Sequence, residues 1–224
     1  YVKDAAGNIS APTAVTVGKV DKTKPTAPTV TGNSTAWTNG NVTLTAKSTD
    51  TGSGVAAYSF STTAGTYAWQ TGAAKAVTAN TTYYVYAKDA AGNISAPTTV
   101  TVGKIDKTKP TAPTVTGNPT SWKKDNTVLT ASATDTGSGV AAYSFSTTAG
   151  TYAWQTGASK TITANGTYYV YAKDAAGNIS APTTVTVSKI DNALPTAPKV
   201  TGNPTAWTNK DITLTAASTD SQSG

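Results

Sequence analysis

Aspartates recur along this chain at three fixed offsets. The chain has 224 residues, and its eleven acidic residues are all aspartate. Nine of them repeat at a spacing of 85 positions, in the sets Asp4/Asp89/Asp174, Asp21/Asp106/Asp191 and Asp50/Asp135/Asp220. Carboxylate oxygens are the side-chain ligands that hard cations such as Ca²⁺ prefer in proteins. The chemistry that this pattern offers is therefore cation binding.

Composition argues against several other functions. The chain has no cysteine and no histidine, and its acids include no glutamate, so only Asp, Lys, Tyr, Ser and Thr remain as possible catalysts. Neither a nucleophile-elbow motif nor a phosphate-binding loop occurs. We therefore expect no enzyme activity and no catalytic residue. The net charge of +6 comes from scattered lysines without a basic stripe, which disfavours nucleic-acid binding. No apolar run approaches the roughly 18 residues of a membrane span, so direct membrane insertion is not expected.

The 85-residue spacing extends over the whole chain and predicts a repeat array. Residues 21–105 and 106–190 align with 14 differences, nine of them between Ser34 and Ser48. The chain then divides into the end of a preceding repeat (1–20), two complete repeats (21–105 and 106–190) and the beginning of a further repeat (191–224). Each junction carries two prolines, as in Pro110 and Pro113, which favour a stiff, extended path.

Side chains within a repeat alternate with a period of two, which predicts strands and no helix. Val42, Leu44 and Ala46 alternate with polar residues, and Val55–Ser61 and Thr82–Lys88 have strong strand composition. Shorter strands are expected at 29–31, 66–70, 75–78 and 98–102. Seven short strands in about 85 residues predict an all-β fold of tandem seven-stranded sandwiches joined by Pro-rich linkers. The pattern places Tyr83, Val85 and Ala87 inward, and Tyr84, Tyr86 and Lys88 outward.

On such a sandwich the repeated aspartates should meet at one pole. The loop between the second and third strands carries Asp50, the loop between the sixth and seventh carries Asp89, and Asp21 lies where the chain enters the repeat. Three carboxylates in one place repel one another, and a bound cation would remove the repulsion. The sequence therefore gives six candidate Ca²⁺ ligands: Asp21, Asp50 and Asp89 in one repeat, and Asp106, Asp135 and Asp174 in the next.

A second interpretation of these aspartates needs no metal. An aspartate at the start of a tight loop often accepts hydrogen bonds from its own backbone, and Asp89 is well placed for this. Lys22, Lys24 and Lys88 could neutralise the cluster. Three carboxylates also supply fewer oxygens than the six to eight that Ca²⁺ takes. Both interpretations stay open on sequence alone.

Three stretches resemble a known family. They are Tyr83-x-Val85-x-Ala87-x-Asp89-x-x-Gly92-Asn93, Asp50-Thr51-Gly52-Ser53-Gly54-Val55 and the linker Asp106-x-Thr108-x-Pro110-x-Ala112-Pro113. They resemble bacterial immunoglobulin-like (fibronectin-III-like) tandem repeats of large cell-surface adhesins. The resemblance covers essentially the whole chain. It implies an extracellular array of β-sandwiches, and it supports Ca²⁺ at the domain junctions.

The tryptophans admit two interpretations. An exposed Trp69 could stack on a sugar ring, but packing within the hairpin or the core needs large side chains too. We expect Trp37 to fill the core and Trp69 to share a face with Tyr67. Intramolecular Lys–Asn or Thr–Gln cross-links are disfavoured, because Lys88 points outward and Gln70 lies on a middle hairpin.

These observations favour a structural role. The expected function is a stalk or spacer of a secreted bacterial cell-surface protein, an adhesin, that projects a distal functional region, with junctions rigidified by Ca²⁺. The expected partners are neighbouring repeats of the same chain. One alternative is a repeated module that binds a glycan or a host-surface protein with avidity. Another is an accessory spacer of a secreted polysaccharide-degrading enzyme.

Overall fold

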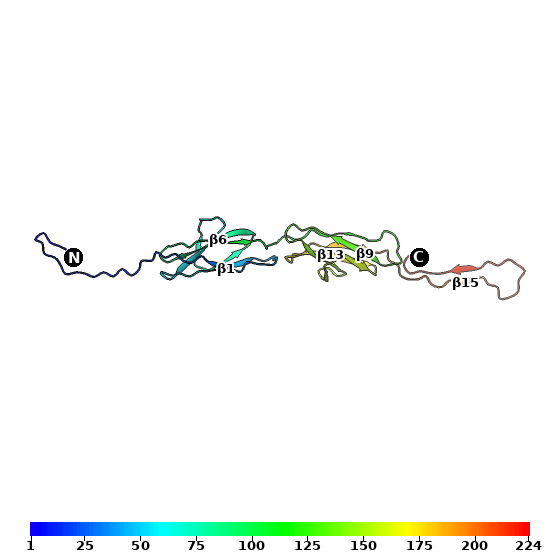
Figure 1. The fold of residues 1–224 in the computed structure, drawn as a ribbon. Coiled ribbons are helices and arrows are strands. Elements are labelled where there is room, and N and C mark those ends of the chain that lie inside the picture. The colour runs from blue at the N-terminus through cyan, green and yellow to red at the C-terminus, as the bar shows by residue number, and fades with distance from the viewer. The chain divides into compact units, whose positions relative to one another are not determined.

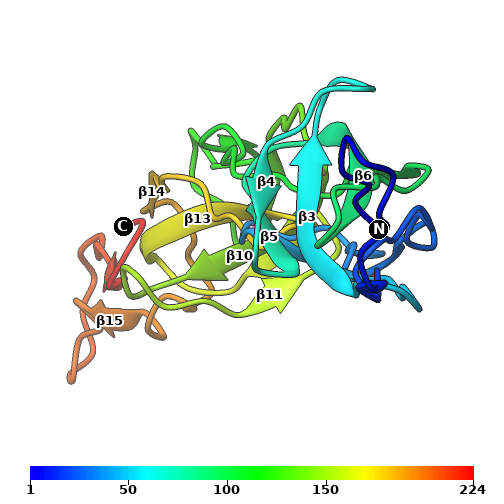
Figure 2. The same cartoon turned by 90° about the vertical axis from the view of Figure 1, so that its left-hand side faces the viewer.

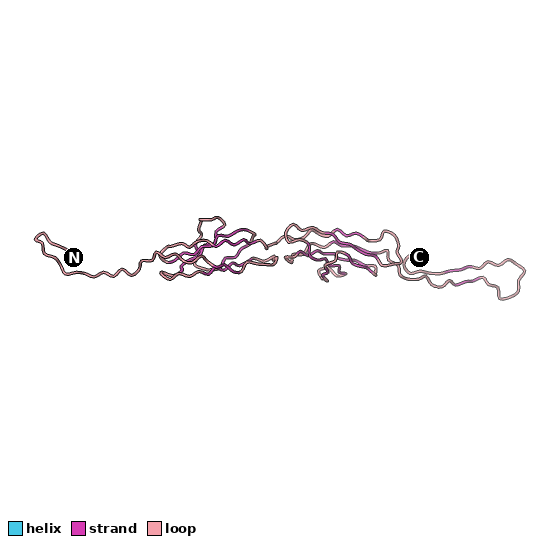
Figure 3. Tube along the Cα trace, in the orientation of Figure 1, coloured by secondary structure: helices cyan, strands magenta, loops and turns pink.

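The computed structural model describes residues Tyr1–Gly224 and contains strands and loops only (Figure 3). The all-β prediction is confirmed. No helix that could cross a membrane is present. By its contacts the chain divides into two compact units. Unit 1 comprises Tyr1–Ala36 and Gly40–Ile105, and unit 2 comprises Trp37–Asn39 and Asp106–Gly224.

Unit 1 contains two antiparallel sheets. One has the strand order β1-β2-β5 and the other has the order β4-β3-β6-β7. Figure 1 labels β1 and β6 of this unit, and Figure 2 labels β3, β4, β5 and β6. The strands are β1 (Thr29–Thr31), β2 (Val42–Lys47), β3 (Val55–Ser61), β4 (Trp69–Gln70), β5 (Ala74–Val77), β6 (Thr81–Asp89) and β7 (Thr98–Val102). β4 is shorter than expected, since only its last two residues pair with β3.

Unit 2 repeats this arrangement with the orders β12-β9-β8 and β11-β10-β13-β14. Its strands are β8 (Thr114–Thr116), β9 (Thr127–Ser132), β10 (Val140–Ser146), β11 (Trp154–Gln155), β12 (Ser159–Ile162), β13 (Gly166–Asp174) and β14 (Thr183–Val187). A further pair, β15 (Lys199–Thr201) and β16 (Thr215–Ala217), follows.

Both sheets of unit 1 contribute to a single core, so they pack face to face as a sandwich. β2 alternates strictly between buried and exposed residues, and Leu44 is completely buried. Leu44 packs in one cluster with Phe60 of β3, Val77 of β5 and Val85 of β6. Leu129 occupies the matching place in unit 2. Burying a side chain of this size contributes about 1.5–3 kcal/mol.

The predicted inward face of β6 is observed, because Val85 and Ala87 are completely buried and Tyr83 packs against the core. The prediction for Tyr86 is wrong in one respect. Its side chain is only 5% exposed, although it lies on the outer face. The loop between β3 and β4 covers it, since the Gly65 N–H donates to the Tyr86 hydroxyl at 2.8 Å and the Tyr67 ring packs edge-on at 4.9 Å.

The tryptophan before the second strand does not fill the core. Trp122 of unit 2 is 42% exposed and lies under the Lys189 ammonium, 4.9 Å from its ring centroid. Trp37 is half-buried and lies outside the core cluster. Aliphatic side chains and Phe60 already fill the space between the sheets. The prediction that Trp37 fills the core is therefore wrong.

Candidate carboxylate site

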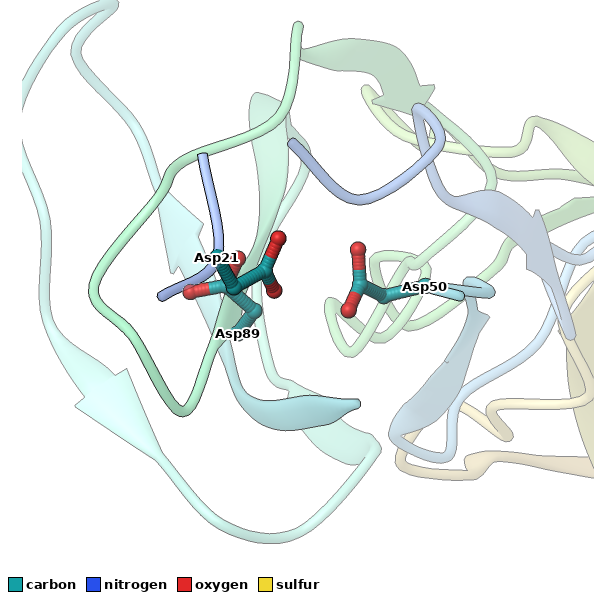
Figure 4. A group of neighbouring side chains, drawn as sticks. All are labelled: Asp21, Asp50 and Asp89. Carbon is teal, nitrogen blue, oxygen red and sulfur yellow. The ribbon is translucent and has the colours of Figure 1, made fainter. Parts of the chain in front are cut away.

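Three aspartates meet at one end of each repeat. In unit 1 they are Asp21, Asp50 and Asp89, each with a carboxylate oxygen within 4.8 Å of the others. Figure 4 shows the Asp50 carboxylate directed toward those of Asp21 and Asp89. In unit 2 the corresponding set is Asp106, Asp135 and Asp174, with the same limit on distance. The structure thus brings together all six predicted candidates, in two groups of three.

Asp21 enters the site from the segment before β1. One of its carboxylate oxygens accepts the Thr23 N–H at 2.9 Å, and the other accepts the Ser53 N–H at 2.6 Å. Hydrogen bonds from the Ser53 side chain, and then from the backbone of Thr23 and Ser53, lower the pKa of Asp21. The second contact needs Gly52, because a Cβ there would lie 2.3 Å from an Asp21 carboxylate oxygen.

Asp50 lies in the loop between β2 and β3. Its Oδ2 accepts the N–H groups of Gly52 at 3.1 Å and Gly54 at 2.8 Å, which closes the loop on the carboxylate. Its Oδ1 is buried and has no hydrogen-bond partner, and Oδ1 of Asp135 in unit 2 is in the same state. A buried carboxylate oxygen without a partner is costly, so this atom is the one unsatisfied element of the site.

Asp89 ends β6 and is 1% exposed. Its Oδ1 accepts the Asn93 N–H and its Oδ2 accepts the Asn93 side-chain amide, both at 2.7 Å. The loop reverses at Gly92, whose φ of 96° favours glycine. The Asn93 amide also donates to the Asp21 carbonyl at 3.1 Å. Asn93 therefore links two of the three aspartates, a role that sequence reasoning missed although Asn93 repeats as Asn178.

Unit 2 reproduces these bonds with a more buried first aspartate. Asp106 is 5% exposed and accepts the N–H groups of Thr108 at 3.0 Å and Ser138 at 2.6 Å. Burial raises the pKa of Asp106, but hydrogen bonds from Ser138 and Thr108 lower it below its ordinary value. Asn178 donates to Asp174 and to the Asp106 carbonyl. The site is thus the same construction in both repeats.

Lysines do not supply the hydrogen bonds of these carboxylates. All the donors in unit 1 are backbone N–H groups, the Ser53 side chain and the Asn93 amide. Lys88 is directed elsewhere, with its ammonium 4.6 Å from the Trp69 ring centroid. Lys22 and Lys24 are exposed. The turn hydrogen bonds expected from the metal-free interpretation are therefore present, whereas Lys88 does not act as the expected neutralising partner.

The donor set fits a hard cation. It consists of oxygen atoms only, and the Asp50 oxygen without a partner is available as a ligand. Each of the other carboxylate oxygens accepts N–H groups and keeps a further lone pair, since a carboxylate offers about four acceptor sites. Water or carbonyl oxygens would have to complete a shell of six to eight. Asp21, Asp50 and Asp89 are the residues that would hold Ca²⁺, and the cation would supply charge neutralisation and a cross-link.

Comparison with known proteins gives limited similarity. No protein-family model matches the chain, and no curated protein matches it. Fibronectin(III)-like modules of Clostridium thermocellum CbhA share 21% identity at a TM-score of 0.39, over 72% of this chain and 93% of theirs. Chitinase ChiA74 from Bacillus thuringiensis shares 22% identity at a TM-score of 0.32, over 75% of this chain and 29% of its own.

A third solved structure is SGBP-B of the Bacteroides ovatus mixed-linkage glucan utilization locus, in complex with a mixed-linkage heptasaccharide. It shares 15% identity at a TM-score of 0.22, over 84% of this chain and 52% of its own. With all three TM-scores below 0.5, the description of the fold rests on strand order and core packing, and the function rests on the site.

Proposed function

We propose that this chain is part of a spacer, a stalk of tandem seven-stranded immunoglobulin-like or fibronectin-III-like sandwiches with repeats at 21–105 and 106–190. In this proposal it belongs to a secreted bacterial cell-surface protein, an adhesin, whose distal functional region it projects. Its partners are the neighbouring repeats of the same chain, and it carries out no catalysis. The repeats set the reach of the protein by their number.

One observation carries this proposal: the carboxylate site recurs bond for bond after 85 residues. In each repeat the first aspartate belongs to the segment that enters the domain, and the other two belong to the loop before β3 or β10 and to the end of β6 or β13. A site of this kind fastens the entering chain to its own domain. Fastening at every repeat is what a spacer under load requires, and it has no evident use in a catalytic pocket.

We further propose that Ca²⁺ occupies these sites. A divalent cation would offset the repulsion of three carboxylates and engage the Oδ1 atoms of Asp50 and Asp135 that have no donor. The cation would then strengthen the hold on the entering segment through Asp21 and Asp106. This makes the stiffness of the stalk dependent on extracellular Ca²⁺.

Two measurements on the 224-residue chain test these statements separately. Deleting residues 106–190 and inserting a further copy of them should change the maximum dimension from small-angle scattering by equal and opposite steps, if the repeats act as a spacer. Equal dimensions for chains of different repeat number would refute the spacer. Isothermal titration with CaCl₂ should show two sites per chain, and the absence of binding heat and of any thermal shift would refute the cation.

A second candidate function rests on the aromatic group outside the four-stranded sheet. The Tyr67 ring stacks on Trp69 at 5.1 Å and 14°, and Tyr67 remains 44% exposed. Tyr152 and Trp154 repeat this geometry. Exposed aromatic faces of this kind bind sugars, so the repeats could give avidity for a glycan. A glycan array of the wild-type chain and of the Trp69→Ala/Trp154→Ala variant decides: hits lost in the variant support binding, and no hits in either exclude it.

A further inference from the structure

The last residue of a complete repeat is fixed in the core of that repeat. Ile190 is 2% exposed and belongs to the core cluster of unit 2. Its N–H donates to the Asn165 side-chain carbonyl at 2.9 Å, and its carbonyl accepts the Asn165 amide at 2.8 Å. Ile105 is held in unit 1 in the same way by Asn80, with both distances 2.8 Å. The exit of each repeat therefore has a defined position.

Asp191, the residue after Ile190, forms hydrogen bonds both with the repeat that precedes it and with the segment that follows it. The Asp191 N–H donates to the Lys123 carbonyl at 2.7 Å, in the connection between β8 and β9 of the repeat that has just ended. The Asp191 carboxylate accepts the N–H groups of Ala193 and Ser223, both at 3.0 Å, in the segment that follows. Asp191 is 6% exposed.

Asp106 follows the same scheme. Its N–H donates to the Thr38 carbonyl at 2.9 Å. Thr38 lies in the first repeat by sequence (21–105), but its contacts place it in unit 2 together with Asp106. Its carboxylate accepts the N–H groups of Thr108 and Ser138. Ile105 and Asp106 are consecutive, so a single peptide bond joins a residue clamped by one repeat to a residue clamped by the next.

We propose that each junction aspartate is shared by two repeats and couples their stabilities, so that loosening the exit of one repeat loosens the carboxylate site of the next. Because the peptide bond between Ile105 and Asp106 is planar, few backbone dihedral angles separate the two residues. No flexible residue lies between them that could absorb a displacement of Ile105. The coupling is of the nearest-neighbour type that governs repeat proteins. It rests on the proposed spacer function, but it needs hydrogen bonds only and no bound cation.

Hydrogen exchange on the 224-residue chain in excess chelator tests the coupling. Asn80→Ala removes the clamp on Ile105 in the first repeat. The Ser138 amide, which donates to Asp106 in the second repeat, should then exchange about 2- to 10-fold faster, as expected for the weakening of one hydrogen bond. Mass spectrometry can separate the repeats with peptides that extend into residues 119–133, where their sequences differ.

A matched control and an uncoupled chain complete the design. Asn33→Ala likewise removes a long-range asparagine hydrogen bond, from its amide to the Thr101 carbonyl at 2.9 Å, against the two that Asn80→Ala removes, and it should leave Ser138 exchange unchanged. Insertion of two glycines between Ile105 and Asp106 changes none of the side chains that hold Ile105 and Asp106 but adds flexible residues between them, so Asn80→Ala should then have no effect on Ser138.

Two results would overturn the proposal. One is unchanged Ser138 exchange in Asn80→Ala. The other is an equal increase with and without the inserted glycines, which would assign the effect to general destabilisation. Neither result bears on how the dimension of the chain depends on repeat number, so the spacer function is judged independently.

Discussion

Replacing the aspartate that has an unsatisfied oxygen should change stability in opposite directions with and without Ca²⁺. In the double variant Asp50→Asn/Asp135→Asn, the side-chain carbonyl can still accept the N–H groups of Gly137 and Gly139 in unit 2, which now lie 3.1 and 2.7 Å from Asp135 Oδ2. The new amide would occupy the position of the buried Oδ1, which has no hydrogen-bond partner in the wild type. One negative charge is lost from each site.

The magnitude follows from the separation of the charges. Carboxylate oxygens of Asp135 and Asp174 lie within 4.8 Å of each other. At an effective dielectric constant of 20 their repulsion is about 3.5 kcal/mol, and partial exposure of Asp135 reduces the effective value to about 1 kcal/mol. Removing it should raise the Tm in chelator by about 4–8 °C. With Ca²⁺ at about 100 times Kd, binding raises the free energy of unfolding of the wild type by about 2.7 kcal/mol. The double variant, whose sites have lost a ligand charge, does not gain this stabilisation.

The assay is calorimetric or fluorescence-detected unfolding of the wild type, the double variant and Asp125→Asn, each in excess chelator and in excess CaCl₂. Asp125 is an exposed aspartate outside the repeated sets and should behave as wild type in both conditions. The order of Tm between wild type and double variant should reverse when CaCl₂ replaces chelator. A double variant that is less stable than wild type by the same amount in both conditions would refute both the repulsion and the cation.

Three further predictions concern single sites of unit 2. The lowered pKa of Asp106 means that its contribution to stability is complete above its ordinary value of 3.8 and is lost as pH falls through the lower folded-state value. The Tm measured in chelator should therefore fall below about pH 4, less steeply in Asp106→Asn. Gly137→Ala places a Cβ 2.3 Å from the Asp106 carboxylate and should weaken Ca²⁺ binding in titration at least about tenfold, or about 1.4 kcal/mol, whereas Gly157→Ala, with no atom nearer than 3.8 Å, should bind normally. Leu129→Ala should cost about 2–5 kcal/mol in denaturant unfolding, and Val128→Ala, at a side chain 48% exposed, under about 1 kcal/mol.

The sequence was sufficient for features that follow from local periodicity. The alternation of Val42, Leu44 and Ala46 predicted β2 and its buried face, and the placement of the repeated aspartates on the loops of a sandwich predicted that three of them would meet. It was insufficient where a loop folds over a strand. The burial of Tyr86 depends on the loop that carries Gly65 and Tyr67. The alternation of side chains along β6 does not predict that this loop packs over Tyr86.

Sequence reasoning also missed the polar groups that hold the site together. Asn93 and Asn80 repeat after 85 residues as faithfully as the aspartates, and that repetition was the available signal. Asparagine serves in many loops as a turn residue, so its long-range bonds to Asp21 and Ile105 became evident only when distant segments were brought together.

The differences between the two repeats bear on what the array must keep constant. Val42 faces Val77 across the β2–β5 pair, and the corresponding pair in unit 2 is Thr127 opposite Ile162. All four side chains are buried to 4% exposure or less. Thr127 replaces a methyl by a hydroxyl, which finds an acceptor in the Gly117 carbonyl at 2.7 Å, and Ile162 adds a methylene on the opposite strand.

A change at one core position is thus accompanied by a change at its partner in register, which keeps the core filled and its polar atom satisfied. The loop that carries Asp50 and Asp135, by contrast, lies within a segment that is identical in both repeats. A core can be repacked pair by pair within one domain. The carboxylate site joins three separate segments of one unit through a fixed set of hydrogen bonds, so a change in one segment has no such pairwise compensation.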